Sequence, residues 1–446
     1  MIKQIQSVYY NMKNSSALRK ILSNSTWLFA DKVLRLLMGL IVGAWVARYL
    51  GPEKFGVLSY ANAFVALFAS VATLGIDGLV VRELSKKNNE EYIDNVLGTA
   101  FWIRVLGGCV STIFSIIVVV CLQPNNVEIK WLVSIISIGN IFQSFDTIAL
   151  LFQAQVNSKC TVQVKFIAFI VISILKVFAI LLNSTLIVFA SLSVIEITIG
   201  SVGLLIPYKK NILKSKFSYT LTASFLKMSW PILLSIICIV IYTKADQIIL
   251  AAFMGETVLG VYSAATRLSE ICYFIPNVII SSVTPYLVKC YVDDRTSYDK
   301  YTKLLFNYLV MVSYVIAIVI TFLSPYIIGI LYGKSYNGAE IVLAVHIWSL
   351  VFVSIGVGFR QVMIIENKII FLLLTTVLGA VTNLALNLWL IPIYSFYGAV
   401  IAIVVSQGVS GYLSTLIYSE TRKLFYTQTR SLFLLDFFKQ IRMGEN

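Results

Sequence analysis

Charged residues are scarce in this chain of 446 residues. Asp, Glu, Lys and Arg make up 13% of it and hydrophobic residues 59%, whereas soluble globular proteins contain about 25% charged residues. Apolar runs of about 20 residues, the length that spans a bilayer, recur along the whole chain. This composition excludes an ordinary soluble domain and predicts an all-α polytopic membrane protein.

Metal-ligand and cofactor patterns are missing as well. The chain has one histidine, His346, and six cysteines that show no CxxC motif and no framework spacing. Metal sites built on His and Cys need several such ligands at short spacings, and a nucleotide-binding pump needs a glycine-rich phosphate loop, which is absent. We therefore expect no metal, no cofactor and no ATP-driven pump, and we interpret the cysteines as small core residues.

The hydrophobic runs predict twelve transmembrane helices joined by short polar loops. They lie at 24–50, 55–84, 96–121, 131–156, 162–182, 185–208, 225–252, 257–288, 303–323, 337–365, 369–391 and 396–419. An even number of crossings places both termini on the same side of the membrane.

The distribution of basic residues indicates which side that is. Lys and Arg gather in both terminal segments and in the loops of one side, whereas the opposite loops contain only Lys54, Lys130 and Lys334. Because cytoplasmic loops carry such an excess, both termini are expected in the cytoplasm. The polar and basic first residues then form a cytoplasmic arm rather than a signal peptide, and the net charge of +14 needs no nucleic acid to explain it.

The sequence also contains an internal repeat. "ARYLGPEKFGVLSYANA" (47–63) aligns without gaps on "AAFMGETVLGVYSAATR" (251–267). Each copy forms the turn between the first two helices of a six-helix half. An even number of crossings separates the copies, so the halves have the same orientation, as in transporters built from parallel repeats. In the alternative interpretation, the shared glycines only mark similar tight turns.

The repeat predicts two parallel six-helix lobes around a central cavity. The expected domains are a basic cytoplasmic arm (1–23), an N-terminal lobe (24–208), a cytoplasmic linker (209–224), a C-terminal lobe (225–419) and a cytoplasmic tail (420–446).

The first predicted helix contains Asp31, Lys32 and Arg35. An Asp, Lys or Arg at the centre of a membrane helix costs roughly 2.5–3.5 kcal/mol. Asp31 and Arg35 are four residues apart, so they can form an ion pair along the helix, but Lys32 is then left over. Further intramembrane charges in the first half are Arg104, Asp146, Lys176 and Glu196.

The second half repeats this feature, with Lys244 and Asp246 in the seventh helix and Arg267 and Glu270 in the eighth. Intramembrane charges usually face a bundle interior or a hydrated cavity, and the helices concerned are related by the repeat. A shared basic cavity is therefore expected, in which Lys and Arg would bind an anion such as a phosphate or pyrophosphate. The alternative is a set of separate structural ion pairs.

Other polar residues have less specific interpretations. Asp77, Arg82 and Glu83 lie near the cytoplasmic end of the second helix, where they are expected to act as interfacial anchors or as a gate. His346 is interpreted as a polar core residue with satisfied hydrogen bonds, and a proton relay is the alternative.

Three segments, "NSTWL" (24–28), "ARYLGPEKFGVLSYANAF" (47–64) and "TLGIDGLVVREL" (73–84), resemble the polysaccharide transporter family. This family includes the O-antigen flippases of the multidrug/oligosaccharidyl-lipid/polysaccharide exporter superfamily. The close match covers the first 85 residues or so, and the twelve-helix layout extends it over the chain. The peptidoglycan-precursor flippases of the superfamily usually have fourteen helices, so the twelve predicted here argue against that group.

The resemblance implies a transporter, not an enzyme, in the bacterial cytoplasmic (inner) membrane. It would move undecaprenyl-pyrophosphate-linked oligosaccharides to the periplasmic leaflet for O-antigen, lipopolysaccharide, capsule or another surface polysaccharide. A polysaccharide polymerase and a chain-length regulator are expected partners. Arg35, Lys32, Lys244 and Arg267 would bind substrate in the cavity, and Asp31, Asp246 and Glu270 would hold these basic groups or exchange protons.

Two other functions remain open. A cation-coupled multidrug antiporter of the same superfamily would favour an apolar cavity with acidic residues. A membrane-embedded glycan polymerase or glycosyltransferase would need a sizeable extramembrane loop, and every predicted loop is short.

Overall fold

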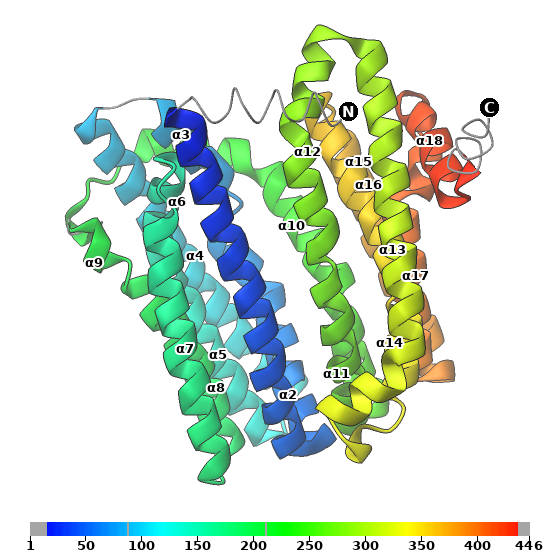
Figure 1. Cartoon of the computed structure of the whole chain (residues 1–446). Coiled ribbons are helices and arrows are strands. Elements are labelled where there is room, and N and C mark those ends of the chain that lie inside the picture. Colours follow the sequence, from blue (N-terminus) through cyan, green and yellow to red (C-terminus); the bar gives the residue numbers. More distant parts are fainter. Residues whose placement is uncertain (1–15, 87–88, 210–211, 436–446) are drawn as a thin grey trace. The chain divides into compact units, whose positions relative to one another are not determined.

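The computed structural model describes residues 16–86, 89–209 and 212–435, without the side chains of 16–32, Lys214 and Ile369. Within these ranges every regular element is a helix (Figure 1). Eleven described helical stretches are long and apolar enough to cross a membrane, and the first, Val33–Lys86, contains two of the predicted helices. The prediction of an all-α membrane protein with twelve helices is confirmed.

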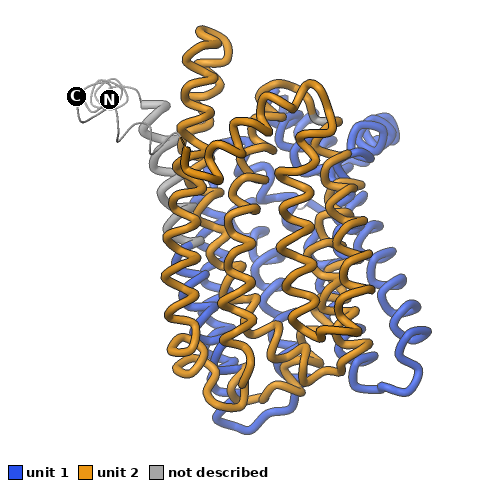
Figure 2. The backbone as a smooth tube through the Cα atoms, turned by 90° about the vertical axis from the view of Figure 1, so that its right-hand side faces the viewer, with its two compact units in different colours: residues 1–46, 68–233 blue, residues 47–67, 234–446 orange. Residues whose placement is uncertain are grey.

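The chain forms two compact units, coloured separately in Figure 2. Unit 1 comprises Met1–Val46 and Phe68–Leu233, and unit 2 comprises Ala47–Leu67 and Leu234–Asn446. Residues 47–67 therefore belong to the second unit, although the sequence pattern places them in the N-terminal lobe.

The helices of unit 1 follow the chain in order, and two of them continue into unit 2. They are α2 (Ser16–Thr73, whose middle lies in unit 2), α3 (Asp77–Lys86), α4 (Glu90–Leu122), α5 (Val127–Phe142), η1 (Gln143–Asp146), α6 (Thr147–Ala154), α7 (Lys159–Leu181), α8 (Leu186–Val202), α9 (Leu205–Tyr208), η2 (Ile212–Lys214) and the start of α10 (Tyr219–Met254).

Unit 2 contains the rest of α10 and the elements that follow it. These are α11 (Glu256–Cys272), α12 (Phe274–Asp293), α13 (Arg295–Leu331), η3 (Lys334–Tyr336), α14 (Ala339–His346), α15 (Ser349–Ile365), α16 (Ile369–Tyr394), α17 (Phe396–Gly411), η4 (Leu413–Leu416), η5 (Ser419–Thr421) and α18 (Arg422–Leu432).

Helix α4 shows how the sequence suits a lipid environment. Large apolar side chains recur every three or four residues and stay exposed, as expected for a surface that faces lipid tails: Trp102, Leu106, Val110, Ile113, Ile117 and Val120. The buried face instead carries Gly107, Gly108 and Ser111. There Asn140 Nδ2 of α5 donates to Ser111 Oγ at 2.9 Å. Small residues and interhelical hydrogen bonds of this kind hold membrane helices together.

The two copies of the repeat have the same backbone turn. Gly51 has φ +71° and ψ 170° and kinks α2, and Gly255 has φ +84° and ψ 173° and precedes α11. Both φ values lie in the region that glycine tolerates and other residues avoid. The two aligned segments thus share one backbone turn, as both interpretations of the alignment predict.

The two copies also pack against each other inside unit 2. A Cβ atom on Gly56 would lie 1.8 Å from the carbonyl oxygen of Glu256. A Cβ atom on Gly260 would lie 1.8 Å from the carbonyl oxygen of Pro52. The contact is reciprocal, and only glycine permits it at either position.

Two predicted helices have ends that differ clearly from those observed. The predicted helix 55–84 is wrong as one element, because α2 ends at Thr73 and α3 starts at Asp77 after a turn in which Leu74 and Gly75 have positive φ. The predicted helix 303–323 is too short, since α13 spans Arg295–Leu331. Hydropathy detects the apolar middle of a helix and misses polar turns beyond the hydrocarbon region.

Three further predicted helices are interrupted. The fourth predicted helix is divided into α5, η1 and α6, and the tenth into α14 and α15. Helix α14 ends at His346, 204 residues after the end of α5 at Phe142, which is also the offset between Gly51 and Gly255. The eighth is divided at Tyr273 between α11 and α12. Pro276 explains this last break, because its ring has no N–H for the carbonyl four residues earlier.

The predicted cytoplasmic tail contains an ordered helix, α18. Ser431 Oγ of α18 donates to Asn307 Oδ1 of α13 at 2.6 Å, and the Tyr314 hydroxyl donates to the Leu432 carbonyl at 3.0 Å. Helix α18 is therefore a packed part of unit 2.

Candidate functional site

Unit 1 contains a polar pocket at the depth of its membrane helices. Its volume is about 230 Å³, and it is lined by residues from α2, η1, α7 and α8: Arg35, Gln143, Asp146, Lys165, Glu196, Ile197, Gly200 and Ser201. The predicted cavity residue Arg35 thus lies beside Asp146 and Glu196, charges that come from other helices.

Ion pairs connect these helices. Lys165 Nζ lies 2.7 Å from Asp146 Oδ1, which also accepts a hydrogen bond from Ser201 Oγ at 3.0 Å. Lys176 Nζ lies 3.0 Å from Glu196 Oε2. Pairing offsets the cost of holding charges among apolar helices.

The Arg35 guanidinium also lies over an aromatic ring of α7. Its Cζ is 5.9 Å from the ring centroid of Phe169, within cation–π range. The side chains of Asp31 and Lys32 lie outside the described residues, so their predicted roles stay predictions. Lys165 lies in α7, within the predicted helix 162–182 and six residues after Lys159.

In unit 2 the predicted residues are divided among different partners. Lys244 Nζ of α10 lies 3.4 Å from Glu270 Oε1 of α11, and both side chains are partly exposed. Arg267, one helical turn before Glu270, is exposed and forms no ion pair among the described residues. The carboxylate of Glu270 therefore pairs across two helices and leaves Arg267 open to a ligand.

Asp246 does not take part in that ion pair. It is 3% exposed, and it accepts hydrogen bonds from the Tyr262 hydroxyl and from the Gln247 N–H at 2.8 Å. Asp246 thus joins α10 to α11 through a buried polar contact.

His346 lies in a buried hydrogen-bonded group at the break between α14 and α15. Its Nδ1 is 2.7 Å from Ser269 Oγ, and its carbonyl oxygen accepts from Ser349 Oγ at 2.6 Å. Ser349 Oγ is also 2.6 Å from the Tyr273 hydroxyl, at the break between α11 and α12. These contacts are those of a polar core residue with satisfied hydrogen bonds.

The predicted gate residues lie on α3. Asp77, in its first turn, forms an ion pair with Arg104, whose side chain is 5% exposed. Glu83 accepts from Lys86 at 2.8 Å and from the Tyr92 hydroxyl at 3.0 Å, and Arg82 Nη2 lies 3.4 Å from it. The sequence pattern did not indicate that Asp77 and Arg104 form a pair, because they belong to different helices.

Two protein-family models match overlapping parts of the chain. The family model described as "Polysaccharide biosynthesis protein" matches residues 21–291, and the model described as MatE matches residues 231–389. The capsular polysaccharide biosynthesis protein CapF of Staphylococcus aureus is 23% identical over 404 residues, which cover 87% of this chain and 97% of CapF.

Solved structures with a similar fold are transporters. An inward-facing multidrug resistance MATE family transporter of the MOP superfamily has a TM-score of 0.73 at 15% identity, covering 89% of this chain and 96% of its own. The lipid II flippase MurJ in an inward closed conformation has a TM-score of 0.68 at 17% identity, covering 94% and 93%. At these identities the likeness concerns the fold alone.

Proposed function

The chain belongs to the polysaccharide biosynthesis protein family, within the superfamily of its MATE and MurJ structural neighbours, and from this premise we propose that it is a flippase. Its substrate would be an undecaprenyl-pyrophosphate-linked oligosaccharide repeat unit. The protein would carry this unit across the bacterial cytoplasmic membrane, with both of its own termini in the cytoplasm, to supply capsule, O-antigen or another surface polysaccharide.

The observation that supports an anionic substrate most directly is the placement of basic side chains within the membrane-spanning helices. In unit 1, Arg35 lines a pocket with Lys165, next to the Lys176–Glu196 pair. In unit 2, Arg267 is exposed with no carboxylate at salt-bridge distance among the described residues. The exposed guanidinium of Arg267 suits a pyrophosphate, whose oxygens accept its paired N–H groups.

In this proposal the protein works by alternating access with a basic cavity. The sugars and the pyrophosphate would cross through the cavity beside Arg35, Lys32, Lys244 and Arg267, while the polyprenyl tail stays in lipid. Glu270 would hold Lys244 in place.

The acidic residues of the two lobes have a second role in the proposal. Asp31 and Asp246 would position neighbouring groups or exchange protons during the cycle. Asp77, Arg82 and Glu83 would form a gate or anchor at the cytoplasmic end.

The alternative transporter function is a cation-coupled multidrug antiporter, which the MATE-like fold equally accommodates. The exposed Arg267 argues against it, because its positive charge would repel a cationic drug. The glycan polymerase is disfavoured because the connections between the described helices are short turns without a platform for a catalytic site.

A genetic experiment tests the proposal. The gene is deleted, and lipid-linked oligosaccharide and surface glycan are quantified after complementation with wild type, Arg35→Ala or Arg267→Ala. We expect complete lipid-linked units to accumulate on the cytoplasmic leaflet in the deletion strain and with both variants, at normal expression. If those units reach the outer leaflet without polymerising, the protein is not the flippase, and a polymerase takes its place.

A further inference from the structure

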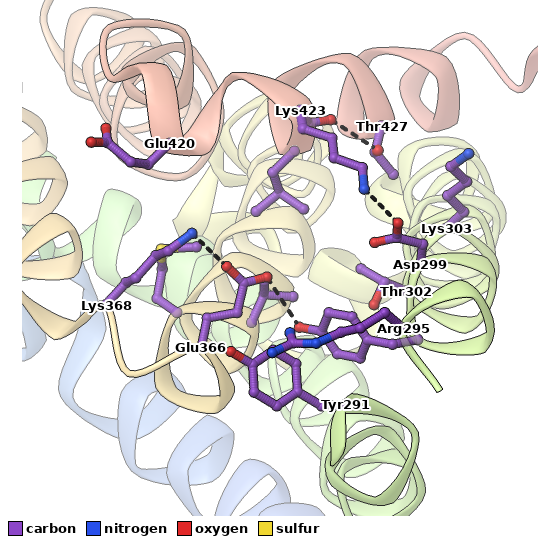
Figure 3. A pocket seen from close by; sticks show the side chains of 14 residues that line it. Tyr291, Arg295, Asp299, Thr302, Lys303, Glu366, Lys368, Glu420, Lys423 and Thr427 are labelled. Atoms are coloured by element: carbon purple, nitrogen blue, oxygen red, sulfur yellow. Dashed lines mark hydrogen bonds and ion pairs between the residues drawn. The ribbon is translucent and has the colours of Figure 1, made fainter. Parts of the chain in front are cut away.

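A second polar pocket lies in unit 2, away from the membrane-depth charges described above (Figure 3). Its volume is about 350 Å³, which is the size of a small-molecule site. Four cations and three carboxylates line it, together with tyrosine and threonine hydroxyls: Arg295, Lys303, Lys368, Lys423, Asp299, Glu366, Glu420, Tyr291, Tyr298, Thr302 and Thr427.

Three helices begin at this pocket, and each has a basic residue at its N-cap or in its first turn. Arg295 is the first residue of α13, Lys368 is the N-cap of α16, and Lys423 is in the first turn of α18. None of these first turns contains an acidic residue, although the carboxylate of Asp294 caps α13. A helix N-terminus carries partial positive charge, so a cation placed there is destabilising unless an anion lies beside it.

The carboxylates of the pocket do not neutralise all of these cations. Lys423 pairs with Asp299, and Lys368 Nζ lies 2.7 Å from Glu366 Oε2. Within the described chain, Arg295 and Lys303 have no carboxylate at salt-bridge distance. Figure 3 shows Arg295 lying across Tyr291, with its Cζ 3.4 Å from the ring centroid. The stacked guanidinium keeps its N–H edge available for a ligand.

A buried hydroxyl also faces this site. Thr302 is 5% exposed and lines the pocket. Its side chain lies beside the Tyr298 hydroxyl, but its Oγ1 has no partner at good hydrogen-bond geometry in the described chain. A buried polar atom without a partner is costly, so such atoms usually mark a site that a ligand or water completes.

We propose that this pocket binds a phosphorylated polyol, with the phosphate against Arg295 and Lys303 and the hydroxyls against Glu366, Glu420 and Thr302. Carboxylates would repel a simple anion, but they accept hydrogen bonds from sugar or glycerol hydroxyls. The ligand is either a soluble polyol phosphate or the head group of a lipid such as phosphatidylglycerol. The inference does not depend on what the protein transports.

Binding to the purified full-length protein in detergent tests this inference. Glycerol 1-phosphate is titrated by thermal shift, and phosphatidylglycerol by native mass spectrometry against phosphatidylcholine. We expect at least one probe to bind saturably. Arg295→Gln and Lys303→Gln should each weaken the binding of that probe about tenfold or more. Lys300→Gln is the matched control, because it removes one charge from the same helix outside the pocket lining.

The outcomes distinguish the two sources of the ligand. Binding of glycerol 1-phosphate assigns the pocket to a soluble polyol phosphate, and selective binding of phosphatidylglycerol assigns it to a lipid head group. Thr302→Val should weaken the same probe without lowering the melting temperature of the free protein. If neither probe binds, or if the Arg295 and Lys303 variants bind as well as Lys300→Gln does, the inference is overturned. Because this test measures ligand binding and not transport, the inference can hold even if the protein fails every glycan assay.

Discussion

Gly56 and Gly260 occupy equivalent positions of the internal repeat, and each lies against the backbone of the other's turn. The position of a Cβ atom on either residue would be 1.8 Å from a carbonyl oxygen, that of Glu256 or of Pro52. Because backbone atoms cannot rotate away as a side chain can, the two helices must separate if either glycine is replaced. This contact joins residues 47–67 to α11 within unit 2.

The first prediction concerns this crossing. Gly56→Ala and Gly260→Ala should each destabilise the protein by about 1–3 kcal/mol, the usual cost of overpacking. The double variant should cost less than the sum, because the first substitution already separates the helices. Melting temperatures in detergent measure this. Gly329→Ala, where a Cβ meets nothing within 4 Å, is the control and should melt like wild type; equal losses at all three positions would contradict the prediction.

The second prediction concerns the ion pair between Lys165 and Asp146. Lys165→Met or Asp146→Asn alone leaves a partly buried charge without its partner, at a cost of about 1–3 kcal/mol. The double variant should recover part of that loss in thermal unfolding. The exposed pair of Lys216 and Glu91 provides the control, since the matching substitutions there should produce no measurable change. Additive losses at Lys165 and Asp146 would show that the two side chains act separately.

The third prediction separates stability from transport at Arg267. Since this side chain is exposed and forms no described ion pair, Arg267→Ala should change the free energy of unfolding by no more than about 0.5 kcal/mol. If Arg267 binds a pyrophosphate, the variant should nevertheless lower surface-glycan export at least several-fold, with partial rescue by Arg267→Lys. Export at the wild-type level by a stable Arg267→Ala protein would remove this residue from the proposed site.

The fourth prediction concerns pH and the start of α13. Hydrogen bonds from the Ser297 hydroxyl, and from the hydroxyl and N–H of Thr296, lower the pKa of Asp294 from 3.8 to about 2. Because the folded-state pKa is lowered, the cap is fully present above pH 3.8 and is lost as the pH falls through about 2. Amide protection factors in the first turn of α13 should therefore be equal at pH 5 and pH 7. Asp294→Ala should reduce them at both values, and a wild-type cap that weakens between pH 7 and pH 5 would contradict the assigned pKa.

Much of the fold follows from local sequence. Apolar runs locate the membrane helices, and the glycines at 51 and 255 mark the repeated turn because a positive φ leaves little choice of residue. The break between α5 and η1 has no such marker, since no proline or glycine stands there. The polar start of α13 is also invisible to hydropathy, although it forms one wall of the second pocket.

The candidate site was predictable as a list of charges but not as a set of pairs. Sequence places Arg35, Lys244 and Glu270 inside helices, where charge is costly. It suggests pairs only between residues one turn apart, such as Arg267 and Glu270. The structure instead pairs Lys244 with Glu270 and Lys165 with Asp146. Partners on different helices depend on how the helices rotate and pack, which no local pattern encodes.

Reconstitution tests the central claim, that the protein moves a lipid-linked oligosaccharide between leaflets, most directly. Purified protein is placed in liposomes that contain a polyprenyl-pyrophosphate-linked oligosaccharide with a labelled sugar, and a membrane-impermeant reagent reports how fast the label reaches the outer leaflet. We predict transfer well above that of protein-free liposomes for wild type, and transfer at the protein-free level for Arg35→Ala. Transfer that is no faster than in protein-free liposomes, from protein that does expel a cationic dye, would contradict the flippase and favour the antiporter.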